Sequence, residues 1–217
     1  RDVGAYGRLI ELVAASSGRI LNLNALCRES GIRYETARRH QQIMVDTLVA
    51  FEVPAWSGSD RASLVAHPKV FLFDAGVRNA LLRRPLDLPL EDERGLLLEH
   101  LVAYELHRRT TGIWPDASLF HFRTSRGAEV DFVLLVGRAL WAIEVKASRN
   151  VDPRGLEGLH AFSERAARIE RQVVVFLGDR RQALDGSKLF RWPSSSASCR
   201  VENYPHTQAS SPGWGWQ

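Results

Sequence analysis

Residues 129–146 read EVDFVLLVGRALWAIEVK, and this stretch decides the fold that the sequence predicts. Two apolar segments flank a Gly-Arg pair at 137–138, which is typical of a turn between antiparallel strands. If the turn is centred there, paired positions sum to 275 and Asp131 lies directly opposite Glu144. Glu144 and Lys146 are two positions apart on one strand, so both point to the same face of the predicted hairpin.

These three charged side chains have the chemistry of a metal site. Two carboxylates that face each other at roughly 5 Å repel unless a cation lies between them, and hard oxygen ligands suit Mg²⁺ or Mn²⁺. We therefore expect Asp131 and Glu144 to bind Mg²⁺ or Mn²⁺, which would activate a water molecule for attack on a phosphodiester. Lys146 would position that water or stabilise the developing charge. The spacing equally fits a surface hairpin whose charges form a solvated ion-pair ladder.

The elements around the hairpin predict one α/β domain over residues 93–193, with a mixed central sheet. The order of the elements, α-β-β-β-α-β, is typical of an α/β sandwich. Helical periodicity and capping residues mark the helices, and short apolar runs mark the strands. The expected elements are a helix over 94–109, strands over 119–123, 130–135 and 140–147, a helix over 153–169 and a strand over 173–177.

Residues 1–84 predict a winged helix-turn-helix domain. A first helix ends near Gly18, Asn24 can cap a short helix that runs to Ser30, and Gly31 separates it from a longer helix. Strand-like segments and a polar turn follow, as in a wing. The expected ranges are 34–48 for the third helix, 49–53 and 63–73 for the strands and 57–60 for the turn. Residues 85–92 read as a linker, and residues 194–217 as a tail outside the fold.

The third helix of the winged helix carries the candidate nucleic-acid contacts Arg33, Arg38, Arg39 and His40. In a helix-turn-helix protein this helix enters the major groove, where arginines bind phosphates or guanine edges. Nucleic acid, and DNA in particular, is therefore the expected partner. The same residues also fit the solvated face of an arginine-rich protein, or a winged helix that only connects proteins.

Composition limits what the protein can be. The 217 residues are 45% hydrophobic and 25% charged, as in a globular protein, and the apolar runs are too short to cross a bilayer. We therefore expect no membrane contact and a cytoplasmic location. A net charge of +4 is too small to argue for nucleic acid by itself. Only Lys69, Lys146 and Lys188 are lysines, against 26 arginines, so a lysine in a chemically suggestive place is more informative here than usual.

The hairpin residues also resemble a known family. Asp131 followed by Glu144-Val145-Lys146 resembles the D-x(n)-E-x-K signature of the PD-(D/E)XK nuclease superfamily. Residues 6–193 look like the carboxy-terminal half of a prokaryotic AAA-type ATPase family, which carries a winged helix and a nuclease-like domain of unknown function behind its ATPase module. The matching segments are 68–76, 95–99, 102–106, 122–132 and 142–146.

The resemblance implies further site residues. Glu99, on the first helix of the nuclease-like domain, matches the acidic residue that approaches the metal, with Glu105 as its competitor. We prefer Glu99, because it lies among apolar residues and the two cannot face one point across about 600° of helical rotation. Glu129 is expected as an ion-pair partner of Lys146 or as an extra ligand. No G-x-x-x-x-G-K-[ST] pattern occurs, so this chain is expected to lack an ATP site, with the ATPase module upstream of it.

Two functions follow from the sequence. The first is a metal-dependent nuclease, or a nuclease-derived module that binds DNA with the help of the winged helix. The second is a catalytically inactive interaction or regulatory module of the ATPase. The presence of Asp131, Glu144 and Lys146 together favours the first, because an abandoned site has no need of the lysine.

Overall fold

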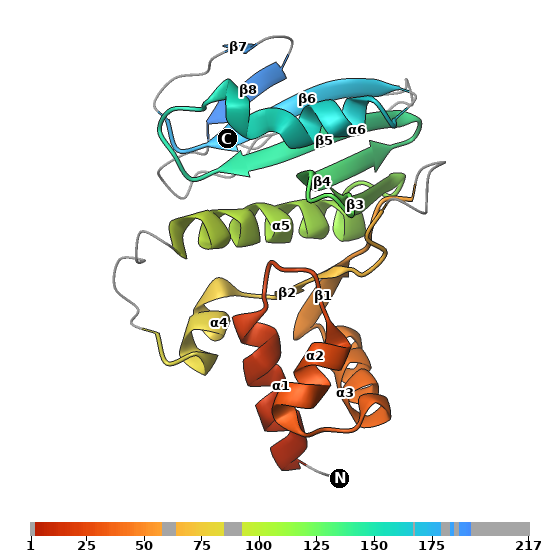
Figure 1. The fold of residues 1–217 in the computed structure, drawn as a ribbon, viewed down its shortest axis with the longest axis vertical. Coiled ribbons are helices and arrows are strands. Elements are labelled where there is room, and N and C mark those ends of the chain that lie inside the picture. The colour runs from red at the N-terminus through yellow and green to blue at the C-terminus, as the bar shows by residue number, and fades with distance from the viewer. Residues whose placement is uncertain are drawn as a thin grey trace.

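The computed structural model describes residues 3–57, 64–84, 93–166, 168–178, 183–184 and 187–191 (Figure 1). The predicted linker over 85–92 and the predicted tail over 194–217 lie outside the described residues. So does most of the predicted turn over 57–60. Mixed α/β structure is observed, as expected.

The N-terminal unit, residues 3–84, contains three helices, a two-stranded antiparallel sheet and a further short helix. Asn22 caps the second helix by accepting a hydrogen bond from the Ala25 amide at 3.0 Å, so the prediction of Asn24 as the cap was wrong. Gly31 ends that helix with a φ of 70°, as expected of a residue in the left-handed region. The elements are α1 (Val3–Ala15), α2 (Leu23–Ser30), α3 (Tyr34–Asp46), β1 (Ala50–Val53), β2 (Lys69–Leu72) and α4 (Ala75–Leu81).

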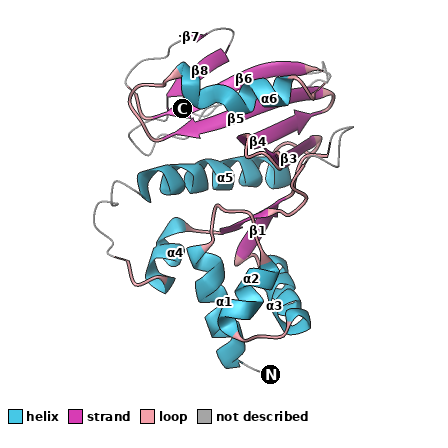
Figure 2. Cartoon of the chain, in the orientation of Figure 1, coloured by secondary structure: helices cyan, strands magenta, loops and turns pink. Residues whose placement is uncertain are grey.

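The C-terminal unit, from residue 93 onward, is built on a mixed sheet with strand order β3-β4-β5-β6-β8-β7 (Figure 2). Strands β3, β4 and β5 form an antiparallel meander, β6 pairs parallel with both β5 and β8, and β7 pairs antiparallel with β8. The crossover from β5 to β6 contains α6. The elements are α5 (Arg94–Gly112), β3 (Ala117–Arg123), β4 (Glu129–Val136), β5 (Ala139–Lys146), α6 (Glu157–Ser163), β6 (Ile169–Phe176), β7 (Ala183–Leu184) and β8 (Ser187–Arg191).

Each face of this sheet is covered by one helix. Val102 and Leu106 of α5 pack on one face, and Leu159 and Phe162 of α6 pack on the other. The predicted helix over 153–169 is shorter than expected. A 3₁₀ turn occupies its first residues, α6 ends at Ser163 and β6 begins at Ile169. Of the residues in the predicted helix only Ile169 enters β6, where it pairs with Leu140 of β5, and this tertiary pairing outweighs the helical periodicity there.

The two units share an apolar core. Phe51 and Phe71 of the β1–β2 hairpin pack in one buried cluster with α5 and with Phe132 of the sheet. Beyond β1, the Trp56 amide donates to the His121 carbonyl at 2.7 Å, so the chain continues along the β3 edge of the large sheet. The hairpin therefore belongs to the packing of both units, and this contact positions the site described next. No helix among the described residues is long and apolar enough to span a membrane.

Candidate functional site: a buried lysine among carboxylates

Lys69, on β2, lies at the centre of a buried ion cluster. Its side chain is 2% exposed, and its Nζ lies 2.8 Å from Glu99 Oε1, 2.7 Å from Glu129 Oε1 and 3.6 Å from Asp131 Oδ1. The four residues come from β2, α5 and β4, and we refer to them as the Lys69 cluster. An ammonium group has three N–H donors, so Lys69 can direct one towards each carboxylate. The cluster therefore joins the hairpin of the N-terminal unit to the C-terminal unit.

Burial and neighbouring charges shift the pKa of Lys69 in opposite directions. Burial alone would lower the pKa of Lys69, but the negative charges of Glu99, Asp131 and Glu129 raise it above its ordinary value. The ammonium therefore stays charged at neutral pH.

The carboxylates of the cluster are unequally compensated. Burial raises the pKa of Glu99 to about 7, although Lys69 opposes this rise. Burial also raises the pKa of Asp131, against the effects of Lys69 and of the Val145 amide. Glu129 differs, because Lys69 and Arg123 outweigh the effect of burial and hold its pKa below the ordinary value. The cluster thus contains more negative charge than its single lysine neutralises.

Close packing fixes the position of Glu129. A Cβ atom added to Gly158 of α6 would lie 1.6 Å from the Glu129 carbonyl oxygen, a distance that no side chain tolerates. Glycine is thus required where α6 crosses β4. The backbone that carries Glu129 is consequently held by α6 on one side, while its carboxylate binds Lys69 and Arg123 on the other.

The predicted hairpin forms in the predicted register. Its turn contains Gly137 with a φ of 60°, and the pairs from Val136–Ala139 to Phe132–Ile143 all sum to 275. The pairing with β3 shifts between Phe120 and Phe122, where three steps along β4 oppose two along β3, so Asp131 lies in a β-bulge. The alternation of residues in β4 does not predict this bulge.

Asp131 and Glu144 consequently have different partners. The Oδ2 atom of Asp131 accepts a hydrogen bond from the Val145 amide at 2.7 Å, and its Oδ1 faces Lys69. Glu144 Oε1 lies 2.7 Å from Lys146 Nζ, whereas Glu144 Oε2 is buried with no hydrogen-bond partner. Burial, and then the charge of Asp131, raises the pKa of Glu144 to about 8. The two ion groups are therefore neighbours that influence each other through charge.

Strand alternation places Glu144 and Lys146 on one side of the sheet. Ile143 packs in the core on the α5 side and Ala142 packs on the α6 side, so Glu144 and Lys146 follow Ala142 onto the α6 side. Of the four predicted catalytic residues, the structure brings Asp131 and Glu99 together through Lys69. It pairs Glu144 with Lys146.

The structure distinguishes between the two acidic residues proposed on α5. Glu99 reaches the Lys69 cluster, whereas Glu105 pairs with Arg108 at 3.0 Å and Arg109 at 2.6 Å on its own helix. The sequence argument that Glu99 points inward is confirmed. Glu129, which was expected to pair with Lys146 or to act as a ligand, pairs with Lys69 and Arg123. Lys69 itself was missed, although it is one of only three lysines in the chain.

The predicted metal site does not fit this arrangement. Among the residues that the structure describes, no group of three or more His, Cys, Asp or Glu side chains is arranged to hold a metal ion. The ammonium of Lys69 takes the position between Glu99, Glu129 and Asp131 that a cation would need. Binding of Mg²⁺ or Mn²⁺ stays a prediction, and we assign no chemical step to it.

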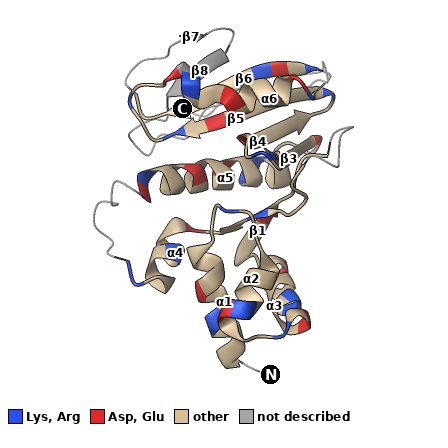
Figure 3. Ribbon diagram, in the orientation of Figure 1, with Lys and Arg blue, Asp and Glu red and all other residues tan. Residues whose placement is uncertain are grey.

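The candidate nucleic-acid contacts lie on α3. Arg33 is the N-cap residue of this helix, and Arg38 and Arg39 are exposed, whereas Ala37 is buried. Figure 3 shows Lys and Arg residues on α3. His40 is a correction to the predicted set. Its ring packs edge-on against Tyr6 of α1 with centroids 5.4 Å apart, and both ring nitrogens are shielded from solvent, so it does not belong to the exposed face.

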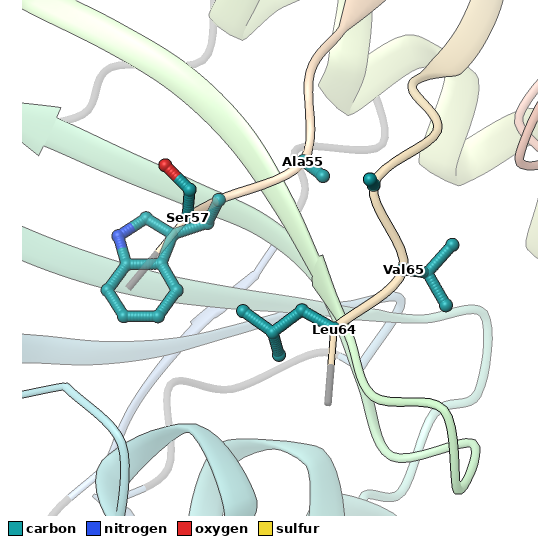
Figure 4. Close-up of a pocket in the computed structure, with 6 residues that line it drawn as sticks. Ala55, Ser57, Leu64 and Val65 are labelled. Atoms are coloured by element: carbon teal, nitrogen blue, oxygen red, sulfur yellow. The ribbon is translucent and has the colours of Figure 1, made fainter. Parts of the chain in front are cut away.

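A separate cavity of about 310 Å³ lies between the two chain segments that extend from β1 and lead into β2 (Figure 4). None of the described residues that line it has an ionisable side chain, in contrast to the residues of the Lys69 cluster. The lining residues are Ala55, Trp56, Ser57, Leu64, Val65 and Ala66.

Comparison with known families divides the chain in two. Residues 94–195 match the model of a domain of unknown function (DUF4143), a domain associated with AAA-ATPase-containing proteins. Residues 1–88 match the model of a second domain of unknown function (DUF8612). No curated protein and no solved structure matches the chain. The first match agrees with the resemblance to the carboxy-terminal part of AAA-type ATPases, and neither description names a winged helix or a nuclease.

Proposed function

We propose that this chain is a nucleic-acid-binding module that acts beside the ATPase module of an AAA-type protein. In this proposal residues 3–84 form a winged helix, and the C-terminal unit is a PD-(D/E)XK-type domain. The observation that carries the proposal is the outward-facing set Arg33, Arg38 and Arg39 on α3, directly before the β1–β2 hairpin. A third helix with exposed arginines in this position is the element that helix-turn-helix proteins place in the major groove.

The element order of the C-terminal unit supports the second part of the proposal. One helix, an antiparallel three-stranded meander and a crossover helix to a parallel strand follow each other, with acidic residues on β4 and β5. The match to DUF4143 over residues 94–195 supports the association with an AAA-type ATPase. Fold similarity does not establish catalysis, so the role of this unit has to be argued from the site.

Binding without cleavage is the role that the Lys69 cluster favours. Asp131 and Glu99, two of the three predicted metal ligands, are engaged by the ammonium of Lys69. An ion network of this kind stabilises the contact between the two units and leaves no position for a metal-bound water. The C-terminal unit would then present and orient the winged helix.

Phosphodiester hydrolysis is a second candidate, favoured by one observation. Lys146 Nζ lies 2.7 Å from Glu144, and the second carboxylate oxygen of Glu144 is buried without a partner. Such an orphaned acceptor is costly and is often explained by function. Incubation of the chain with linear, nicked and branched DNA and Mn²⁺ tests this candidate. Cleavage that is lost in both Asp131→Asn and Lys146→Ala would support hydrolysis, and the absence of any metal-dependent cleavage would exclude it for these substrates.

Nucleic-acid binding is tested with the triple variant Arg33→Ala, Arg38→Ala, Arg39→Ala. We expect weaker binding to any duplex, measured by fluorescence anisotropy, and a slope of log K against log salt that falls by about one unit per lost contact. A matched control replaces three exposed arginines of the C-terminal unit, Arg108, Arg126 and Arg138, and removes the same charge. If the α3 variant binds like the wild type and with the same slope, the unit is a connector and the proposal is wrong.

A further inference from the structure

Lys69 is the first residue of β2, the second strand of the β1–β2 hairpin. Its ammonium reaches out of the N-terminal unit and is buried among three carboxylates of the C-terminal unit. The aromatic ring of Phe132 lies on another side, with its centroid 5.9 Å from Nζ. A lysine is rarely buried unless it is paired, so this site is built to hold a cation.

The charge balance shows that a single ammonium is a poor match for the site. Glu99, Glu129 and Asp131 supply three carboxyl groups against the one ammonium of Lys69, and among the described residues only Glu129 has a second cation within 4 Å, Arg123, at 3.1 Å. Three carboxylate oxygens from three side chains are also the ligand type that Mg²⁺ and Mn²⁺ prefer.

We propose that Lys69 is the built-in cation of this cluster, and that it excludes divalent metal ions as long as the β1–β2 hairpin is docked. Removal of its ammonium uncovers a divalent-cation site formed by Glu99, Glu129 and Asp131. Because Lys69 belongs to the N-terminal unit and the three carboxylates to the C-terminal unit, metal binding and docking of the lysine compete for the same oxygens.

Distances make this exchange feasible. The nitrogen-to-oxygen distances to Glu99 and Glu129 are 2.8 Å and 2.7 Å. A Mg²⁺ ion binds oxygen at about 2.0–2.1 Å, so a metal in place of the ammonium would require these carboxylates to move inward by less than about 1 Å. Asp131, at 3.6 Å, would move further, and the β-bulge that contains it is a place where a strand adjusts.

The test uses the full chain with Lys69→Met, which keeps the length of the side chain, and Lys69→Gln, which keeps a donor for the carboxylates. Mn²⁺ binding is measured by calorimetry and by electron paramagnetic resonance. We expect one Mn²⁺ per chain in each variant and no saturable binding in the wild type. At a 100-fold excess over its Kd, Mn²⁺ should raise the Tm of the variants by roughly 5 °C or more and leave that of the wild type unchanged.

Two controls identify the ligands. Lys146→Met removes the other lysine of the region and leaves Lys69 in place, so it should bind no Mn²⁺. Adding Asp131→Asn to Lys69→Met should abolish the Mn²⁺ binding that the single variant gains. Neither measurement uses nucleic acid, so the outcome is independent of whether the chain binds it.

Several results would overturn the inference. Wild-type protein that binds Mn²⁺ as tightly as Lys69→Met would show that the lysine excludes nothing. Folded Lys69→Met and Lys69→Gln that bind no Mn²⁺ would show that the carboxylates form only an ion network. If both variants are unfolded by circular dichroism, Mn²⁺ should restore the folded spectrum, and failure to restore it also contradicts the proposal.

Discussion

Lys69 and Lys146 make ion pairs of equal length in very different surroundings. Each Nζ lies 2.7 Å from a glutamate oxygen, in Glu129 and Glu144 respectively. The side chain of Lys69 is 2% exposed and bonds to groups from two other elements, whereas that of Lys146 is 33% exposed and bonds to a residue two positions away on its own strand. Distance alone therefore says little about what an ion pair does for the protein.

Burial and connectivity explain the difference. Water reaches Lys146, although Glu144 is mostly buried, and the pair links residues that the strand already holds close together. The Lys69 cluster has lost most of its water, so the cost of desolvation must be offset by the mutual attraction of its members. It also joins segments that are 30 and more residues apart, and so it stabilises tertiary structure directly.

The largest expected effect is the loss of stability in Lys69→Met. This change leaves three buried carboxylates without their cation, and breaking a buried pair in this way costs about 3–5 kcal/mol. Lys146→Met should cost less than about 1 kcal/mol, because its pair is partly solvated. Urea unfolding at pH 7 measures both changes in the free energy of unfolding. Equal losses for the two variants would contradict the distinction drawn between the two lysines.

The sequence predicted the hairpin neighbours of Glu144 but not the partners of Lys69. The register of the β4–β5 hairpin follows from two apolar runs and a Gly-Arg turn, so the neighbours of Glu144 could be named in advance. Lys69 is far from Asp131 along the chain, and hydrophobic periodicity does not reveal which distant strand docks against a sheet. The excess of arginine over lysine was the only signal, and it gave no partner.

Other differences have equally specific causes. The β-bulge at Asp131 depends on pairing with β3, which the alternation of β4 alone does not encode. His40 follows two exposed arginines in sequence, but α1 covers its ring through Tyr6. Helix α4 was not predicted, although Asp74 caps it by accepting a hydrogen bond from the Val77 amide at 2.9 Å. In the first two cases tertiary contacts supplied what the local pattern lacked, whereas the cap of α4 is a local signal.

A smaller effect on stability is expected from pH, and it depends on Glu144, the partner of Lys146. Burial raises the pKa of Glu144 from its ordinary 4.5 to about 8. Between these values the folded protein holds a proton that the unfolded chain has released. The stability that this group contributes is therefore fully present below about pH 4.5 and is lost as the pH rises through 8.

Glu144→Gln removes this dependence, because the amide does not titrate. The free energy of unfolding of the variant, relative to the wild type, should increase between pH 5 and pH 9 by on the order of 1–3 kcal/mol, since one pKa unit corresponds to about 1.4 kcal/mol. Urea unfolding across this range measures the difference. Lys146→Met serves as the control that disturbs the same pair but leaves the carboxyl group. Parallel pH profiles for Glu144→Gln and the wild type would show that the carboxyl is not held protonated.

The smallest expected loss of stability is that of Glu105→Gln. The ion pairs of Glu105 lie on the surface of one helix and serve as a reference for both lysine sites. Glu105 bonds to Arg108 and Arg109 within one face of α5, and these hydrogen bonds and charges hold its pKa below the ordinary value although burial opposes them. Such i,i+3 and i,i+4 pairs contribute about 0.3–0.5 kcal/mol each, so Glu105→Gln should cost less than about 1 kcal/mol. At 1 M NaCl the Debye length falls to about 3 Å, and the cost should largely disappear.

The cost of Lys69→Met, in contrast, should change little with salt, because counterions do not reach a side chain that is 2% exposed. Urea unfolding of both variants at low and high salt measures this contrast, and a Lys69→Met cost that salt removes to the same extent as that of Glu105→Gln would place the Lys69 cluster among solvated surface pairs.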